Sequence, residues 1–170
     1  MSVVVYRPIS CCNVHYKIIA KLIVQRLSAV LDKIINPCQA AFVPGRSIGA
    51  QELFSIYKQS RHPPRCALKV DIQKAYDTVE WDFLLSVLQL FEFSDIFNRS
   101  IDECFTTPFS VGMNGKPHGF FSGRGLRQGV PLSPYLFVLV MEVLHMGLLQ
   151  LIEQDMKFTF HWKCEALRVF

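Results

Sequence analysis

The chain has 170 residues, enough for one domain or for part of a larger one. Hydrophobic residues make up 51% and charged residues 19%, so burying a hydrophobic core is not the difficulty. The net charge of +4 suits a polyanionic partner but does not establish one, because many basic proteins bind no nucleic acid.

Cysteines and the first residues bear on the cellular compartment. Six cysteines are present, but none form a C-x-x-C pair and no histidine lies at the spacing of a zinc site. Residues 1–6 are too short for the apolar part of a secretory leader, and Arg7-Pro8 interrupts them. We therefore expect reduced thiols and an intracellular protein, nuclear or cytoplasmic.

The first third of the chain is predicted to be mostly helical. Asn13 can cap the first helix, and the Asn-Pro pair at 36–37 ends it. A Pro-Gly turn at 44–45 precedes a second helix over residues 47–59. Residues 61–65 (RHPPR) form a stiff basic linker, the one plausible boundary between subdomains. The apolar face of the first helix comprises Ile19, Ile23, Leu27, Val30 and Ile34.

The middle of the chain alternates between strand and helix patterns. Residues 66–70 are apolar except for Lys69 and predict a short buried strand, and a helix follows from Trp81. Ser94 opens another helix that runs to about Phe105. A hairpin is predicted over residues 109–121, around the turn pair Asn-Gly at 114–115.

The last third begins with a long apolar helix. Ser133 is predicted as its N-cap and Pro134 as its first helical residue. Residues 135–152 could span a bilayer by length, but they include Glu142, His145 and Gln150, so we expect a buried core helix and no membrane partner. Strands are predicted at 157–162 and 166–170. The mixture lacks strict βαβ alternation and predicts an α+β fold.

Residues 69–81 (KVDIQKAYDTVEW) place one carboxylate, Asp71, between the predicted strand and a helix. A strand end that carries an acid before a turn and a helix is a common way to hold a metal ion over a sheet. Aspartate also commonly ends a strand or caps a turn. This stretch alone leaves both interpretations open.

A second stretch, residues 124–134 (RGLRQGVPLSP), is a basic, glycine-rich loop that runs into the long helix. Together the two stretches resemble the reverse transcriptase domain of LINE-type (non-LTR) retrotransposons, especially those abundant in plant genomes. The resemblance continues in the family's order and covers nearly the whole chain, in residues 6–10 (YRPIS), 16–21 (YKIIAK) and 39–46 (QAAFVPGR).

The resemblance implies the fingers and palm of a right-hand polymerase, with fingers at residues 1–62 and an incomplete palm at residues 63–170. The implied activity is RNA-directed DNA polymerase, using an RNA template, a DNA primer and deoxynucleoside triphosphates, within a retroelement polyprotein. Two Mg²⁺ ions are implied in the complete domain. By resemblance Asp71 is the catalytic carboxylate and first metal ligand, and the backbone carbonyl of Ile72 supplies another oxygen.

The resemblance also implies a nucleotide site. Tyr76 lies where the family places an aromatic ring that would exclude a ribose 2′-hydroxyl, although a core aromatic is the alternative. Asp77 matches the family pattern, yet a hydrogen bond that stabilises the turn explains it as well. Gln128 and Gly129 lie where the family contacts the nascent base pair. The alternative is that this loop only serves helix entry.

Four arginines are candidates for phosphate contacts. Arg7 matches the fingers arginine that the family uses on the incoming triphosphate. Arg46 follows the Pro-Gly turn and could contact template or primer phosphates. For both, a solvated surface side chain is an equally good explanation. Arg124 and Arg127 are expected to face phosphate backbone rather than bases.

Two departures from the family pattern matter. The loop usually reads QGDPLSP, and here Val130 replaces the acid; Val130→Asp is expected to raise the activity of a completed domain through the helix dipole. The family's other two metal-binding aspartates lie on a hairpin after a strand that starts near Ala166. The sequence ends at Phe170, so we expect a chain truncated before that Asp-Asp hairpin, without thumb or endonuclease, and inactive alone.

Three functional interpretations follow. The first is a reverse transcriptase fragment that is active only in its full-length context. The second is a catalytically inactive remnant that still binds nucleic acid through its basic loops. The third is a degenerate retroelement product without a selected role.

Overall fold

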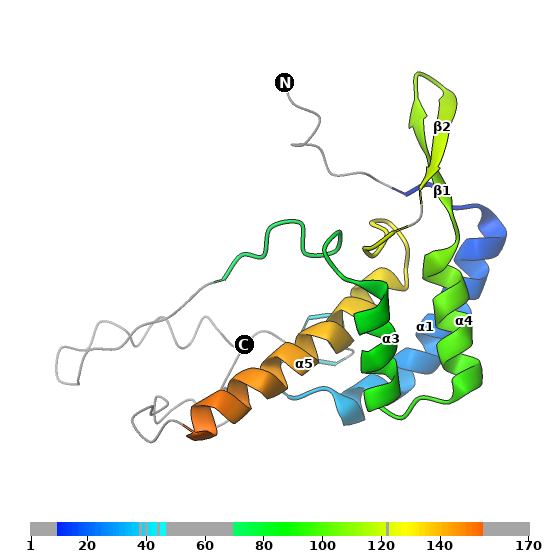
Figure 1. Cartoon of the computed structure of the whole chain (residues 1–170). Helices are drawn as coiled ribbons and strands as arrows, with labels where there is room; N and C mark the ends of the chain where they lie inside the picture. Colours follow the sequence, from blue (N-terminus) through cyan, green and yellow to red (C-terminus); the bar gives the residue numbers. More distant parts are fainter. Residues whose placement is uncertain are drawn as a thin grey trace.

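The computed structural model describes residues 10–37, 39, 41–43, 45–46, 70–121 and 123–154. Within them the chain forms helices and one small sheet (Figure 1). The elements are α1 (Val14–Ile34), α3 (Trp81–Leu90), α4 (Asp95–Thr106), β1 (Phe109–Met113), β2 (Lys116–Phe121) and α5 (Ser133–Gln154).

The first helix begins where its capping residue predicts. The side-chain oxygen of Asn13 accepts a 2.8 Å hydrogen bond from the backbone N–H of Tyr16, which satisfies one of the free donors of the first turn. The buried stripe of α1 is rotated from the predicted face, because Ile19 is 51% exposed. The side chains that the stripe buries are Ala20, Ile23, Leu27 and Leu31.

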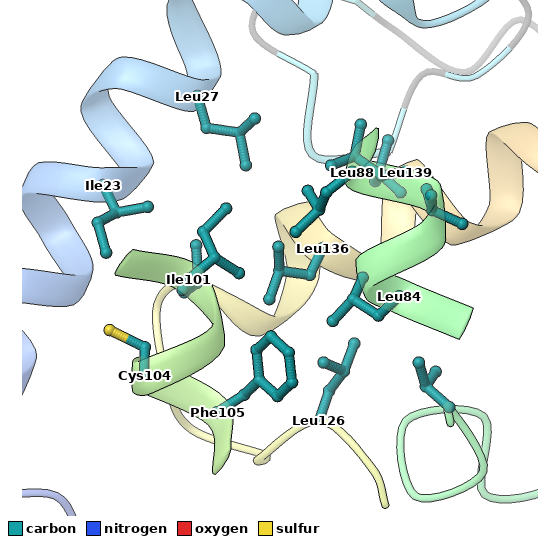
Figure 2. Close-up of a cluster of buried hydrophobic side chains, with 14 of the residues drawn as sticks. Ile23, Leu27, Leu84, Leu88, Ile101, Cys104, Phe105, Leu126, Leu136 and Leu139 are labelled. Atoms are coloured by element: carbon teal, nitrogen blue, oxygen red, sulfur yellow. The ribbon is translucent and has the colours of Figure 1, made fainter. Parts of the chain in front are cut away.

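The core lies between the helices that the structure describes and is closed by the loop before α5. Helix α3 packs on α4 and α5, and α1 packs on α4 and α5 as well. Figure 2 shows Leu126 rising from the loop between Phe105 of α4 and Leu84 of α3. Each fully buried leucine contributes roughly 1.5–3 kcal/mol by leaving water. The loop is therefore part of the core as well as a connection.

The hairpin forms as its turn pair predicts. Met113 pairs with Lys116, and the two turn residues between them, Asn114 and Gly115, have φ values of 51° and 75°. Two positive φ values in a two-residue turn match the right-handed twist of the strands. In the described part of the chain, β1 and β2 pair only with each other and project from the helices (Figure 1).

The strand predicted over residues 66–70 is not confirmed at Val70, the one residue of it that the structure describes. Val70 belongs to no strand and is 70% exposed. A strand needs a partner strand for its backbone groups, and no described strand lies alongside it. Residues 66–69, the predicted helix at 47–59 and the predicted strands at 157–162 and 166–170 lie outside the described residues.

The long apolar helix is a core helix over its first half. By length and composition α5 could cross a membrane, a test that the core helices of soluble proteins also pass. Leu136 and Leu139 are buried, whereas Leu144 and Leu151 are exposed, so the prediction of a buried helix is correct only for the first half. The helix also begins one residue earlier than predicted, at Ser133.

Candidate functional site

The segment that carries the candidate aspartate, residues 71–80, folds as an irregular turn, called here the acidic turn. The N–H groups of Asp77 and Thr78 donate to the carbonyl of Lys74, at 2.8 and 3.2 Å. Lys74 itself has a positive φ of 52°. Asp71 and Ile72 lie at the start of this turn and both residues are exposed, so the Asp71 carboxylate is accessible to a ligand in solvent.

The basic loop, residues 123–132, lies directly against the acidic turn. The N–H of Leu126 donates to the carbonyl of Tyr76 at 2.7 Å, and the N–H of Gly125 donates to the carbonyl of Val79 at 2.8 Å. The indole N–H of Trp81 closes the contact with a 3.0 Å hydrogen bond to the carbonyl of Gly125. The two motif-bearing segments therefore form one continuous surface.

Tyr76 is half-buried at the junction of the acidic turn and α5. Its ring meets the ring of Phe137 edge to face, with centroids 4.9 Å apart and an interplanar angle of 61°. Such pairs stabilise by about 0.5–1.5 kcal/mol beyond their buried area. Burial raises the pKa of the Tyr76 hydroxyl above its usual range. The ring is thus held against α5 with one part still accessible.

Gln128 and Gly129 form the turn at the end of the basic loop. The carbonyl of Gln128 accepts a 2.9 Å hydrogen bond from the N–H of Ser10. Gly129 is exposed and has a φ of 88°, a region that favours glycine. Next to the turn, the hydroxyl of Ser133 donates to the carbonyl of Arg127 at 2.6 Å. Ser133 therefore does not cap α5 as predicted but braces the loop.

The two arginines of the loop have different surroundings. Arg124 pairs with Glu80 at 3.2 Å, and both side chains are more than 60% exposed. An exposed pair of this kind is worth roughly 0–1 kcal/mol, so Arg124 can exchange Glu80 for another anion at little cost. Arg127 is half-buried over the ring of Tyr16, 5.7 Å from its centroid, and donates to the carbonyl of Phe105 at 3.4 Å.

Arg46 lies away from this surface, at the end of α1. Its guanidinium binds the carboxylate of Asp32 at 2.8 Å and donates to four backbone carbonyls of the helix end and the following turn. Only 13% of its side chain is exposed. These contacts satisfy carbonyls that the helix leaves without partners. The described geometry gives Arg46 a structural role, and it does not bring Arg46 to the acidic turn.

Arg7 lies outside the described residues. Among the residues that the structure describes, no group of three His, Cys, Asp or Glu side chains could hold a metal ion. One carboxylate does not fit a two-ion site, because Mg²⁺ demands several oxygen ligands. Asp71 alone therefore supports no catalytic step through a metal.

An apolar groove runs between the acidic turn and α5. Its lining includes Ile72, Phe83, Val140 and Leu144, and it exposes very few polar atoms. Such a lining suits packing of apolar groups and not binding of phosphate.

Sequence patterns did not single out three residues that hold the surface together: Trp81, Gly125 and Phe137. Trp81 and Gly125 meet only because residues 44 positions apart fold together. Phe137 follows the helical period of α5 like any core residue. The one usable indication was that Gly125 follows Arg124 in a basic loop where each glycine permits unusual backbone.

Comparison with known proteins gives a consistent result. A family model described as reverse transcriptase (RNA-dependent DNA polymerase) matches residues 4–161. The chain is 35% identical over 146 residues to an uncharacterized 149 kDa protein of transposon TX1 from Xenopus laevis, covering 81% of the chain and 11% of that protein. It is 28% identical over 148 residues to the retrovirus-related Pol polyprotein of type-1 retrotransposable element R2 from Popillia japonica, covering 82% of the chain and 20% of that protein.

A shorter match is closer in sequence. Over 33 residues, 19% of the chain, it is 64% identical to an uncharacterized mitochondrial protein of Arabidopsis thaliana and covers 27% of that protein. The chain thus spans between a tenth and about a quarter of the length of these relatives.

Proposed function

The chain belongs to the reverse transcriptase family, and we propose that its acidic turn and basic loop bind the incoming deoxynucleotide and the primer–template of an RNA-directed DNA polymerase. Its relatives are proteins of non-LTR retrotransposons. Because the chain spans only a small part of them, polymerisation is proposed for a larger protein to which this domain contributes.

One observation carries the proposal: the hydrogen bond from Leu126 to Tyr76 joins the two segments on which the family resemblance mainly rests. The surface so formed presents an exposed carboxylate at Asp71, a partly accessible ring at Tyr76 and an exposed glycine at Gly129. The exposed guanidinium of Arg124 suits the anionic end of a ligand, the ring of Tyr76 and the open backbone at Gly129 suit a flat end, and the Asp71 carboxylate can face a phosphate only through a bridging cation. A nucleotide is such a ligand.

Each residue of the surface has a proposed task. The Tyr76 ring, held by Phe137, excludes a 2′-hydroxyl by steric contact and so selects deoxynucleotides. Gln128 hydrogen-bonds the sugar or base edge, and Gly129 allows close approach. Arg124 contacts backbone phosphate in place of Glu80. Arg127 also contacts phosphate, but with only part of its guanidinium, because the group lies over the ring of Tyr16.

We propose that Asp71 contributes one carboxylate, and Ile72 one carbonyl, to a divalent-ion site that needs further ligands. Mg²⁺ is the ion that such hard oxygen ligands favour. The proposed division into fingers (residues 1–62) and palm (residues 63–170) follows the same family expectation, and Arg7 would belong to the fingers. The remaining partners are the other domains of the retroelement polyprotein.

A second candidate function is nucleic-acid binding without catalysis. It is favoured by one observation, the lack of a complete metal-ligand cluster among the described residues. Basic loops alone support salt-dependent binding to phosphates.

Binding is tested first, by fluorescence anisotropy with a labelled DNA primer annealed to an RNA template. We expect affinity to fall steeply with salt, and Arg124→Ala to lower the slope of log K against log salt by about 1. Arg99→Ala, a change of an exposed arginine on α4, is the matched control and should leave the slope unchanged. No salt-dependent binding by the wild type would overturn both candidate functions.

Primer extension by a longer protein that contains this domain then separates the two. With Mg²⁺ and deoxynucleotides, extension by the wild type that Asp71→Asn abolishes supports the polymerase. Binding without any extension by that longer protein supports the second function.

A further inference from the structure

Gly125 makes the closest backbone contact between the basic loop and the acidic turn. It is buried and has a φ of 99°. A Cβ atom at this position would lie 3.1 Å from both the Cα and the carbonyl oxygen of Asp77. These are backbone atoms, which cannot rotate away as a flexible side chain can. Only glycine therefore fits this position without moving one segment relative to the other.

Both backbone polar groups of Gly125 are used in the same contact. Its N–H donates to Val79 at 2.8 Å, and its carbonyl accepts from the indole of Trp81 at 3.0 Å. The indole ring is itself held by Phe105 of α4, with ring centroids 5.7 Å apart. The contact is therefore fixed from both sides and tied to the helical core.

The next residue anchors the contact further. Leu126 is 2% exposed, and Figure 2 shows it directed into the core beside Phe105 and Leu84. Its N–H donates to Tyr76, the residue proposed to contact the sugar. A shift of the loop at Gly125 would move Leu126 out of the core and break this hydrogen bond.

We propose that Gly125 and Trp81 are positioning residues that fix the register of the basic loop on the acidic turn. Through that register they set where Gln128 and Gly129 meet a nucleotide held at Tyr76. The register itself stands on the contacts above, whereas its consequence for a nucleotide rests on the proposed function.

The chain offers a matched control for the glycine. Gly115, in the hairpin turn, also has a positive φ of 75°, but nothing lies within 4 Å of the position of a Cβ there. Gly115→Ala thus introduces a similar backbone strain without the contact. A difference between Gly125→Ala and Gly115→Ala measures the close approach to Asp77. Trp81→Phe keeps a ring beside Phe105 and removes the indole donor together with part of the ring system.

The register is tested by amide hydrogen exchange of the full chain. We expect Gly125→Ala to speed exchange of the Leu126 amide by roughly tenfold or more, and Gly115→Ala to leave it unchanged. Trp81→Phe should give an intermediate increase. Equal protection of Leu126 in Gly125→Ala and in Gly115→Ala would overturn the proposed register.

The positioning role is tested with a dideoxy-terminated primer on an RNA template. Primer–template affinity is measured without nucleotide, with the next complementary dNTP and with the corresponding NTP. Each nucleotide gives a gain in affinity over the nucleotide-free value, and the gain with dNTP is divided by the gain with NTP. The ratio of the two gains does not depend on the folded fraction, so simple destabilisation leaves it unchanged. We expect Gly125→Ala and Trp81→Phe to lower the ratio at least threefold, and Gly115→Ala to keep it.

An unchanged ratio in Gly125→Ala, with lost protection of Leu126, would overturn the positioning role and leave the register intact. No gain with any nucleotide in the wild type would overturn the proposed nucleotide site and this role with it. Hydrogen exchange would still decide the register by itself.

Discussion

The hydroxyl of Tyr16 donates a 2.7 Å hydrogen bond to the backbone carbonyl of Cys104, across the interface between α1 and the end of α4. The Arg127 guanidinium lies over the ring of the same tyrosine. One side chain thus connects α1, α4 and the basic loop. The candidate site depends on this connection, because Arg127 shares its loop with Gln128 and Gly129.

The Tyr16 contact should make stability sensitive to alkaline pH. Burial raises the pKa of the Tyr16 hydroxyl to about 12, against a smaller lowering by the Arg127 charge. Between pH 10 and 12 the unfolded chain loses this proton and the folded chain keeps it, so stability is full below pH 10 and falls as pH rises toward 12. We expect Tyr16→Phe to lower the free energy of unfolding by about 1 kcal/mol at pH 8.

Urea unfolding at pH 8, 10 and 11 checks this expectation. The wild type should lose more stability than Tyr16→Phe over that range, because the variant lacks the titrating group. If the free energy of unfolding of the two proteins falls equally with pH, folding does not raise the pKa of the Tyr16 hydroxyl.

Arg46 should contribute to stability more than to nucleic-acid binding. Its guanidinium joins Asp32 to the carbonyls of Ile35 and Asn36, so Arg46→Ala leaves several carbonyls without their donor. We expect Arg46→Ala to lower the free energy of unfolding by about 2–3 kcal/mol. Arg46→Lys should recover less than half, since an ammonium cannot reproduce the planar fork.

The control is Arg99→Ala on the exposed side of α4, which should stay within about 0.5 kcal/mol of the wild type. A role of Arg46 in phosphate binding predicts a different result. If Arg46→Ala unfolds like the wild type but weakens salt-dependent binding of primer–template, Arg46 contacts phosphate, the role that its place after the Pro-Gly turn left open.

Local chemistry explains which elements could be predicted. Asn13 and Ser94 accept hydrogen bonds from the first turns of α1 and α4, and such caps depend only on neighbouring residues. Asn114 and Gly115 likewise determine their own turn. These predictions are confirmed because each requires no information from a distant part of the chain.

The assembly of the site could not be predicted in the same way. Gly125 requires a glycine because of the backbone of Asp77, and Trp81 finds its acceptor 44 residues away. The strand expected at Val70 was wrong at that residue because strand propensity is realised only beside a partner strand. The family resemblance named the segments of the site but not the contacts that join them.

Val130 occupies a position where two effects oppose each other. Its side chain is 4% exposed in the core cluster, three residues before α5. An aspartate there would favour the helix dipole but would bury a charge, and the second effect is larger. We expect Val130→Asp to lower the free energy of unfolding by at least about 2 kcal/mol at pH 7. The family pattern predicts higher activity with this acid. Such a gain requires that enough Val130→Asp protein stays folded despite the lower free energy of unfolding.

Val130→Asn is the control, because asparagine has nearly the same shape as aspartate but carries no charge. Thermal unfolding of both variants at pH 7 and pH 4 should show their difference shrinking at the lower pH, because a protonated aspartate is neutral. A Val130→Asp protein as stable as the wild type would mean that the loop satisfies the carboxylate.

Glu142 is a buried acid in the middle of α5. It is 5% exposed, and its Oε2 atom has no hydrogen-bond partner among the described residues. Leaving such a group unsatisfied costs about 1–3 kcal/mol, and methionine has a similar length without the charge. We expect Glu142→Met to raise the free energy of unfolding by about 1 kcal/mol in urea titrations. Glu153→Met, on an exposed position of the same helix, should change it by less than about 0.5 kcal/mol. A clear loss of stability in Glu142→Met would instead reveal a partner for this carboxylate in the rest of the chain.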